Sequence, residues 1–156
     1  MSGVGAVFAP MLFLRQACAA IVLVIVTLGI QSAGMAGLIE WAKTHFARGA
    51  HALGAWGSAV LVVRLTSLII CLHILEILLW TVFYRWRCLG TWESAFYFSA
   101  TSYSTVGYGD VVLQPVWRLL GPVESISGVL MCGLSASFLF AVVTRLLESR
   151  ESAKKP

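Results

Sequence analysis

The sequence predicts an all-α integral membrane protein with three membrane-spanning helices and one re-entrant half-helix, which is followed by a glycine-containing loop. Of its 156 residues, 59% are hydrophobic and only 12% are charged, whereas soluble domains have about 45–50% apolar and about 25% charged residues. The mean hydropathy is +0.87. Three apolar segments approach or exceed the roughly 20 residues that cross a bilayer, and a fourth is much shorter.

The first span is predicted over residues 16–39, between Arg15 and Glu40. Its core, "ACAAIVLVIVTLGI", also resembles a signal-peptide core, with "QSAG" as a weak cleavage site. We favour a retained helix, because no charge precedes Arg15 and the apolar character continues past that site. This helix is expected to pack outside the second span, away from any permeation path.

Residues 40–57 mix basic, tryptophan and histidine residues, which is typical of a loop or short helix at the membrane surface. Residues 1–57 thus form an N-terminal span with an interfacial loop. The second span is predicted over residues 65–84, between Arg64 and Arg85.

A half-helix is predicted over residues 92–104, because the apolar run is too short to cross a bilayer. Thr91 is the expected N-cap. The third span is predicted over residues 122–146, with Pro122 in its first turn and Glu124 near its positive end. Residues 58–147 then form one membrane domain, followed by a short charged tail over residues 148–156.

The string "TVGYGD", residues 105–110, follows the half-helix. Non-helical backbone at membrane depth is tolerated where it is packed in protein or lines a watery path. Glycine adopts positive φ freely, so alternating glycines allow successive carbonyls to point the same way. Such a row of oxygens is a ligand set for a cation, although one strand cannot surround an ion.

This string resembles the selectivity-filter signature of pore-loop potassium channels. The sequence around it resembles small bacterial single-pore-loop channel proteins with an extra N-terminal span. The segments that carry this resemblance are "HILEILLW…SAFYFSATSYSTVGYGDVV…WRLLGPVESISGVLMCGLSASFLFAVV". The resemblance covers residues 65–146, about half of the chain. It implies a potassium-channel pore domain of outer helix, pore helix, filter and inner helix, assembled as a homotetramer in a lipid bilayer for passive potassium transport.

Carried over by position, the resemblance implies that K⁺ is the only bound metal and that no cofactor is needed. The ion ligands are the Thr105 hydroxyl and the backbone carbonyls of Thr105, Val106, Gly107 and Tyr108. Gly109 turns the chain to the outer mouth, and Asp110 adds negative charge there. Tyr108 is expected to brace the filter against the pore helix.

The segment departs from the commonest pattern of these channels at four positions. Ser102 replaces a usual threonine, Tyr97 and Phe98 replace tryptophans, and Thr101 stands where some relatives have a carboxylate. Because aromatic bulk is retained, we expect potassium selectivity to survive these changes, while inactivation behaviour stays open.

His73 and Glu76 lie three residues apart in the second span, so they share a helix face. Ionisable groups inside a span are costly and are functional candidates. The simplest interpretation is a mutually satisfied pair that bonds the pore helix or a neighbouring span. Proton sensing and a metal site are the alternatives, with no third metal ligand evident.

The third span carries small residues on one stripe, which favours close packing against the outer helix. They are Gly121, Ser125, Gly128, Cys132 and Ser135. If this helix bends to open a pore, Gly128 and Gly133 are the hinge candidates. Phe140 lies toward its inner end, where an apolar constriction can gate by dewetting.

The resemblance places the filter mouth outside and the C-terminus in the cytoplasm, and three spans then place the N-terminus outside. Basic residues agree with a multi-pass protein of the cell membrane in this orientation, with seven inside and four outside. The inside set is Lys43, Arg48, Arg64, Arg145, Arg150, Lys154 and Lys155, and the outside set is Arg15, Arg85, Arg87 and Arg118.

The sequence favours a channel over an enzyme, because it shows no nucleophile motif or evident metal site. It also contains no nucleic-acid-binding motif. Two alternatives stay open: a non-conducting membrane subunit or sensor that retains a pore-loop fold, and a weakly selective cation channel. Of the four cysteines, Cys88 is expected beyond the second span as an exposed free thiol, with a bridge to another copy as the alternative.

Overall fold

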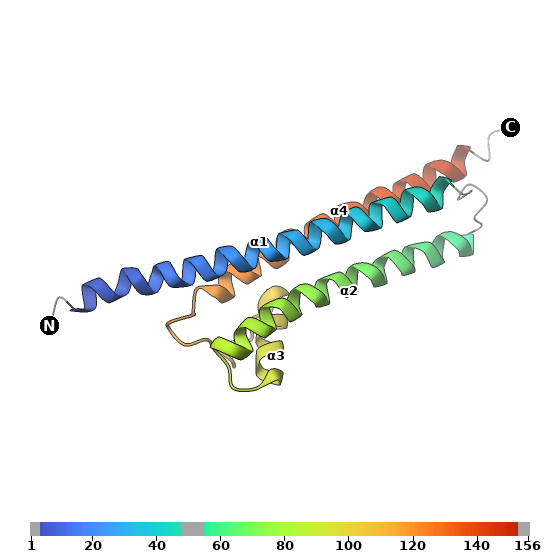
Figure 1. The fold of residues 1–156 in the computed structure, drawn as a ribbon. Helices are drawn as coiled ribbons and strands as arrows, with labels where there is room; N and C mark the ends of the chain where they lie inside the picture. The colour runs from blue at the N-terminus through green and yellow to red at the C-terminus, as the bar shows by residue number, and fades with distance from the viewer. Residues whose placement is uncertain (1–3, 48–54, 153–156) are drawn as a thin grey trace. The chain divides into compact units, whose positions relative to one another are not determined.

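The computed structural model describes residues 4–47 and 55–152 of the chain. Its regular secondary structure in these ranges consists of α-helices without strands, as predicted, and residues 88–91 and 104–119 between them are not helical (Figure 1). The four helices are α1 (Val4–Ala47), α2 (Ala55–Arg87), α3 (Trp92–Tyr103) and α4 (Leu120–Ser152). Three helices are long and apolar enough to cross a membrane, over Pro10–Thr44, Trp56–Arg87 and Leu120–Glu148.

The long helices extend further than predicted. Residues 40–47 continue α1 and residues 55–57 begin α2, so the predicted interfacial loop over residues 40–57 is wrong for these parts. The rest of that loop lies outside the described residues. No glycine or proline occurs between Leu38 and Ala47 to end the helix. A helix also pairs its own backbone N–H and C=O groups, so it can continue beyond the apolar segment without leaving these groups unpaired.

The short helix α3 follows α2 after a brief turn and agrees with its predicted bounds to one residue. Thr91 is its N-cap, as predicted, and its Oγ1 accepts a hydrogen bond of 3.2 Å from the Ser94 N–H. Helix α4 begins two residues before the predicted start, with Pro122 in its first turn. Pro122 is tolerated there because the first N–H groups of a helix have no partner within it.

The chain divides into two compact units, each of which contains parts of the long helices. The first unit comprises residues 1–29 and 75–130, and includes α3 and the glycine-containing loop. Its core is aromatic: the Phe83 and Trp117 rings meet edge to face at 5.3 Å, and Tyr84 and Phe98 do so at 5.0 Å. The buried members of this core are Leu23, Trp80, Tyr84, Ala95, Leu113, Trp117 and Leu120.

Helix α1 is tied into this first unit by polar contacts as well as by packing. The Arg15 guanidinium lies 4.7 Å from the ring centre of Trp117. The Gln16 Oε1 accepts a hydrogen bond from the Leu119 N–H just before α4, and Trp80 Nε1 donates to Thr27 Oγ1. Helix α1 therefore packs against α2, as expected, and it also contacts the segment that leads into α4. Its place away from a permeation path stays a prediction.

The second unit comprises residues 30–74 and 131–156 and contains an aliphatic core from α1, α2 and α4. The buried members are Leu38, Leu61, Leu65, Ile69, Val142 and Leu146. Helices α1 and α2 approach closely at Gly34, where a Cβ atom would lie 2.6 Å from Leu72 Cδ1. At one end of this core, the Arg64 guanidinium lies 5.6 Å from the Trp41 ring centre.

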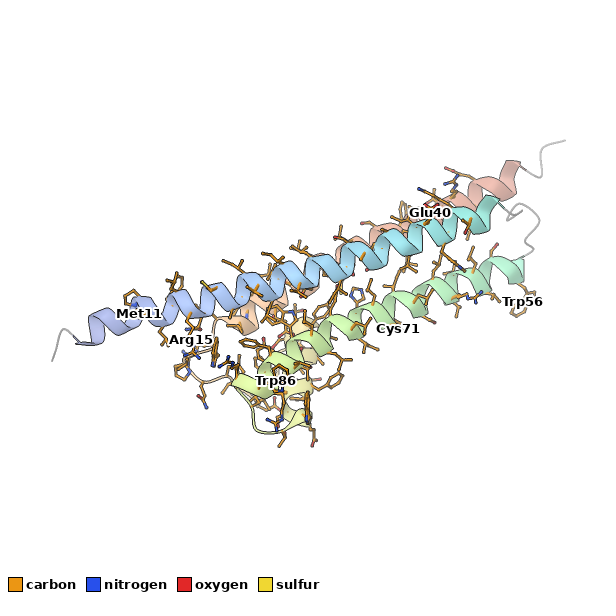
Figure 2. All side chains as sticks on the ribbon, in the orientation of Figure 1. Met11, Arg15, Glu40, Trp56, Cys71 and Trp86 are labelled. Carbon is orange, nitrogen blue, oxygen red and sulfur yellow. The ribbon has the colours of Figure 1, made fainter. Side chains whose placement is uncertain are left out.

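Large apolar side chains point away from the long helices. Met11, Trp56 and Trp86 stand out from the ribbon in Figure 2, and Trp56 is 85% exposed. Helices that are apolar all round belong in a protein core or a membrane. These surfaces are therefore suited to lipid or to neighbouring subunits.

The Cys88 thiol packs against the aromatic core of the first unit and is half-buried, not exposed as predicted. Burial raises its pKa to about 11. Because the thiolate is the nucleophile, we expect Cys88 to react with a maleimide much more slowly than free cysteine at pH 7.5. The rate should rise about tenfold per pH unit up to pH 10.

The measurement uses a variant in which the other three cysteines are replaced by serine. Free cysteine, whose pKa lies near 8.5, is the control and should level off above pH 9. A Cys88 rate that levels off at the same pH as the control contradicts the burial of this thiol.

Candidate functional site

The segment predicted to be the filter, residues 105–110, is named the filter segment after that prediction. It leaves the C-terminus of α3 in a conformation that alternates along the chain. Thr105, Gly107 and Gly109 have positive φ values of 62°, 50° and 79°, whereas Val106 and Tyr108 between them do not. Positive φ is routine for glycine and costs a threonine roughly 1–2 kcal/mol. The alternation turns successive peptide units so that their carbonyls can share one side.

Backbone hydrogen bonds tie the start of the filter segment to the last turn of α3. The Thr105 N–H donates to the Ser102 carbonyl at 2.9 Å, and the Gly107 N–H donates to the Thr101 carbonyl at 3.1 Å. These bonds use the N–H groups on one side of the strand. They hold the strand in its non-helical conformation against the half-helix.

Aromatic and acidic side chains hold the C-terminal end of the filter segment against α3. The Tyr108 ring stacks on the Tyr97 ring of α3, with centres 6.4 Å apart and planes inclined by 14°. The Tyr97 hydroxyl donates to Asp110 Oδ2 at 2.9 Å, and this hydrogen bond raises the pKa of Tyr97 above its ordinary value. Tyr108 thus lies against α3, where it was expected.

Glu124 of α4 is completely buried and joins three helices behind the filter segment. Its Oε2 accepts a hydrogen bond of 2.7 Å from the Tyr84 hydroxyl of α2, and its Oε1 accepts one of 2.5 Å from the Ser99 hydroxyl of α3. Sequence reasoning placed Glu124 only as a helix-terminal charge. The available signal was a carboxylate inside a span, which requires buried partners.

Glu76 of α2 is also completely buried, and it accepts a hydrogen bond from the Tyr103 hydroxyl at the C-terminal end of α3. The interpretation that Glu76 bonds the pore helix is therefore supported by the structure. His73, one turn earlier on α2, is half-buried. Within the described residues, no group of three or more His, Cys, Asp or Glu side chains could hold a metal ion.

Gly121, Ser125 and Gly128 of α4 pack against α3, and not against the outer helix as predicted. Ser135 of the same stripe instead contacts Gln31 of α1. The Ser125 hydroxyl lies 2.7 Å from the Ser102 carbonyl, and a Cβ atom on Gly121 would lie 3.2 Å from the Phe98 ring. At Gly128 a Cβ atom would lie only 2.1 Å from the Tyr103 carbonyl oxygen. Gly128 is therefore required for close approach of α4 to α3, which argues against it as a hinge.

We expect Gly128→Ala to destabilise the protein by about 1–3 kcal/mol, because the added methyl group overlaps backbone that cannot move easily. Gly133→Ala is the matched control on the same helix, where the methyl group meets nothing within 4 Å. That control should be neutral or more stable by up to about 1 kcal/mol. Thermal unfolding of both variants in detergent tests this, and equal effects contradict the packing.

The other gating candidates lie on open parts of α4 in a single chain. Gly133 has open space around it, and the Phe140 side chain is exposed. Their roles in gating stay predictions.

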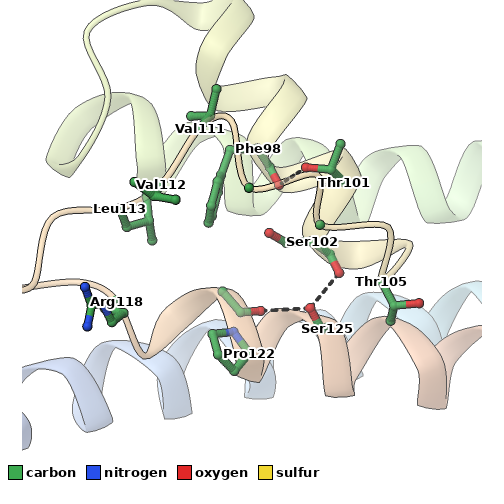
Figure 3. A pocket seen from close by; sticks show the side chains of 13 residues that line it. Phe98, Thr101, Ser102, Thr105, Val111, Val112, Leu113, Arg118, Pro122 and Ser125 are labelled. Atoms are coloured by element: carbon green, nitrogen blue, oxygen red, sulfur yellow. Dashed lines mark hydrogen bonds between the residues drawn. The ribbon is translucent and has the colours of Figure 1, made fainter.

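A cavity of about 540 Å³ lies between α3, the filter segment and the first turns of α4 (Figure 3). Phe98 and Ser102 line one side and Arg118 and Ser125 line the other, while Thr105 lies at one end. Two dashed lines in Figure 3 mark the Ser125 hydrogen bonds to the Ser102 and Gly121 carbonyls, and a third marks the bond from the Thr101 hydroxyl to the Phe98 carbonyl. The filter segment is thus held to α3 at its start by backbone hydrogen bonds and at its end by Tyr97. The cavity leaves open space between the filter segment and the first turns of α4.

Comparison with known proteins adds one positive finding. A protein-family model described as "Ion channel" matches residues 68–145, which is half of the chain. The match begins within α2, contains α3 and the filter segment, and ends within α4. No curated protein and no solved structure matches the chain.

Proposed function

We propose that this chain, which belongs to the ion channel family within the pore-loop superfamily, is a potassium-selective channel whose filter consists of residues 105–110 from four copies. The observation that carries the proposal is the alternating positive φ at Thr105, Gly107 and Gly109. This conformation suits a row of carbonyl oxygens that replaces the hydration shell of K⁺.

Exposure of the filter segment supports assembly around an axis. In one chain every residue from 104 to 110 is exposed, including Val106 at 51% and Tyr108 at 72%. A non-helical, partly apolar strand at membrane depth must be covered by protein or must line water. Four strands around an axis satisfy both conditions, since their carbonyls face the axis while their side chains meet α3 and the neighbouring copies.

Fixed charges favour a cation at both ends of the proposed filter. The C-terminus of α3, which carries the partial negative charge of the helix dipole, leads directly into Thr105. Asp110 adds a carboxylate at the other end, where Tyr97 holds one of its oxygens. Neither charge selects K⁺ over Na⁺, so selectivity rests on the carbonyl ligands of Thr105 to Tyr108.

The orientation proposed for this multi-pass membrane protein places Asp110 and the N-terminus outside and the C-terminus in the cytoplasm of the cell. Support comes from the distribution of basic residues, seven to four, counted over the whole sequence. A cysteine-reactive, membrane-impermeant reagent applied to whole cells tests this with single cysteines placed at Glu93 and Glu148. Only the Glu93→Cys variant should react from outside.

Potassium flux into liposomes that contain the purified protein tests the proposed function, with sodium as the control ion. We expect flux for K⁺, little for Na⁺, and block of the K⁺ flux by Ba²⁺, a divalent cation close to K⁺ in size. Equal, barium-insensitive fluxes favour a weakly selective cation channel. No flux from a folded tetramer over a range of pH favours a non-conducting subunit, and either outcome contradicts the proposal.

A further inference from the structure

A buried amide from α1 bridges one turn of α4 in the second unit. Gln31 is only 1% exposed, and its Nε2 lies 3.2 Å from the Met131 carbonyl oxygen and 3.1 Å from Ser135 Oγ. Met131 and Ser135 are themselves buried and lie four residues apart on α4. One amide nitrogen therefore contacts both ends of a single helical turn.

The bridged turn contains the features that weaken a helix. Gly133 lies between Met131 and Ser135, and glycine is among the residues least able to hold a helical conformation. A Cβ atom at Gly133 would meet nothing within 4 Å, so no neighbour supports the turn at this point. The Ser137 hydroxyl also donates to the Gly133 carbonyl at 2.9 Å, and hydroxyl bonds of this kind bend helices slightly.

The Gln31 amide is not needed to fill space. The Met131 carbonyl already has a place in the hydrogen-bond ladder of α4, and the Ser135 hydroxyl can bond within its own helix. Gln31 Oε1 is buried with no hydrogen-bond partner among the described residues, so the amide carries a desolvation cost. A leucine would fill the same space without that cost, which indicates that the two Nε2 contacts have a separate role.

We propose that Gln31 is a positioning residue for the turn of α4 that contains Gly133, residues 131–135. Its two Nε2 contacts, named the splint, resist bending of this turn, so that the N-terminal helix sets how readily α4 bends. The structure holds α4 unbroken from Leu120 to Ser152 with the splint in place. Loss of the splint favours bending at Gly133. The effect on conduction rests on the proposed channel function, whereas the effect on helix opening does not.

Amide hydrogen exchange of α4 in the full-length protein tests the splint directly. In Gln31→Leu, we expect the amides of residues 131–139 to exchange about fivefold faster, as for loss of one net hydrogen bond. The double variant Gln31→Leu/Gly133→Ala should return to the wild-type rate, because alanine stiffens the same turn. Ser32→Leu, which introduces the same residue at the adjacent exposed position, is the matched control and should leave the rate unchanged.

Single-channel recording measures the dwell times of the gating states. A residue that only stabilises the fold would not change one of these dwell times selectively. In Gln31→Leu, the mean dwell time of the gating state with unbroken α4 should shorten about fivefold, and the dwell time of the other state should not change. Unitary conductance and the preference for K⁺ over Na⁺ should equal those of the wild type. Gly133→Ala should cancel the change in dwell time.

Ser135→Ala keeps the proposal testable if Gln31→Leu does not fold, since it removes only one of the two Nε2 partners. Its exchange rate over residues 131–139 should rise about twofold. If the variants that fold exchange their α4 amides at the wild-type rate, the proposal is wrong. It is also wrong if exchange is faster in Gln31→Leu but adding Gly133→Ala does not slow it. Absence of flux in the wild-type protein contradicts the channel function instead, and leaves the exchange result standing on its own.

Discussion

Replacing Gly107 by alanine is expected to abolish selective potassium flux. Gly107 has φ of 50°, and an L-residue pays roughly 1–2 kcal/mol for this conformation. In the proposed tetramer the four copies together carry about 4–8 kcal/mol of strain. A segment held by few hydrogen bonds relieves this strain by changing its conformation. The Gly107 N–H bond to the Thr101 carbonyl then breaks, and the carbonyl row loses its alignment.

The measurement is K⁺ flux into liposomes containing the Gly107→Ala protein, after gel filtration confirms that its assembly equals that of the wild type. Gly90→Ala is the matched control, because Gly90 lies in a turn with open space around it and without the positive φ of Gly107. Flux and K⁺ preference in the control should equal the wild-type values. Wild-type flux in Gly107→Ala contradicts the assignment of residues 105–110 as the filter.

Replacing Glu124 by alanine is expected to destabilise the protein by about 2–6 kcal/mol. The change leaves the Tyr84 hydroxyl buried without its partner, at about 1–3 kcal/mol. The Ser99 hydroxyl loses one of its two acceptors but keeps the Ile77 carbonyl, and the cavity left by the buried side chain adds a cost of similar size. It also releases α3 from α4 behind the filter segment. We therefore expect loss of ion selectivity in any fraction of the protein that still assembles.

Thermal unfolding and the K⁺-to-Na⁺ flux ratio measure these two effects. Glu124→Gln keeps an acceptor oxygen and the shape of the side chain, so it should restore most of the stability. Glu148→Ala removes an exposed carboxylate from the same helix and should change stability by less than about 0.5 kcal/mol. Adding Tyr84→Phe to Glu124→Ala should cost little more, and full additivity of the two changes contradicts the hydrogen-bonded cluster.

The sequence predicted the helices and the non-helical segment after α3 well, because both leave local signals. Long apolar runs mark membrane spans, and Thr91 marks the start of α3 through a side-chain bond to a residue three positions away. The match of the ion channel family model to residues 68–145 confirms the resemblance that "TVGYGD" indicated. The ends of α1 and α2 were missed because charged and tryptophan residues there resemble a loop although they continue a helix.

The contacts between distant segments could not be predicted in this way. Gln31 and Met131 lie 100 residues apart, and nothing in a sequence pattern indicates that an amide in one span faces a carbonyl in another. The same holds for Glu124, whose partners come from α2 and α3. Gly128 could be assigned to a stripe of small residues, but only the fold shows that the stripe meets the Tyr103 backbone.

The most direct test of the potassium filter is the reversal potential of the purified protein in a planar bilayer, with K⁺ on one side and Na⁺ on the other. A filter of Thr105 to Tyr108 carbonyls predicts a reversal potential displaced strongly toward the potassium equilibrium potential, and block by Ba²⁺. A reversal potential near zero shows that K⁺ and Na⁺ pass equally well. That result contradicts a selective filter in residues 105–110.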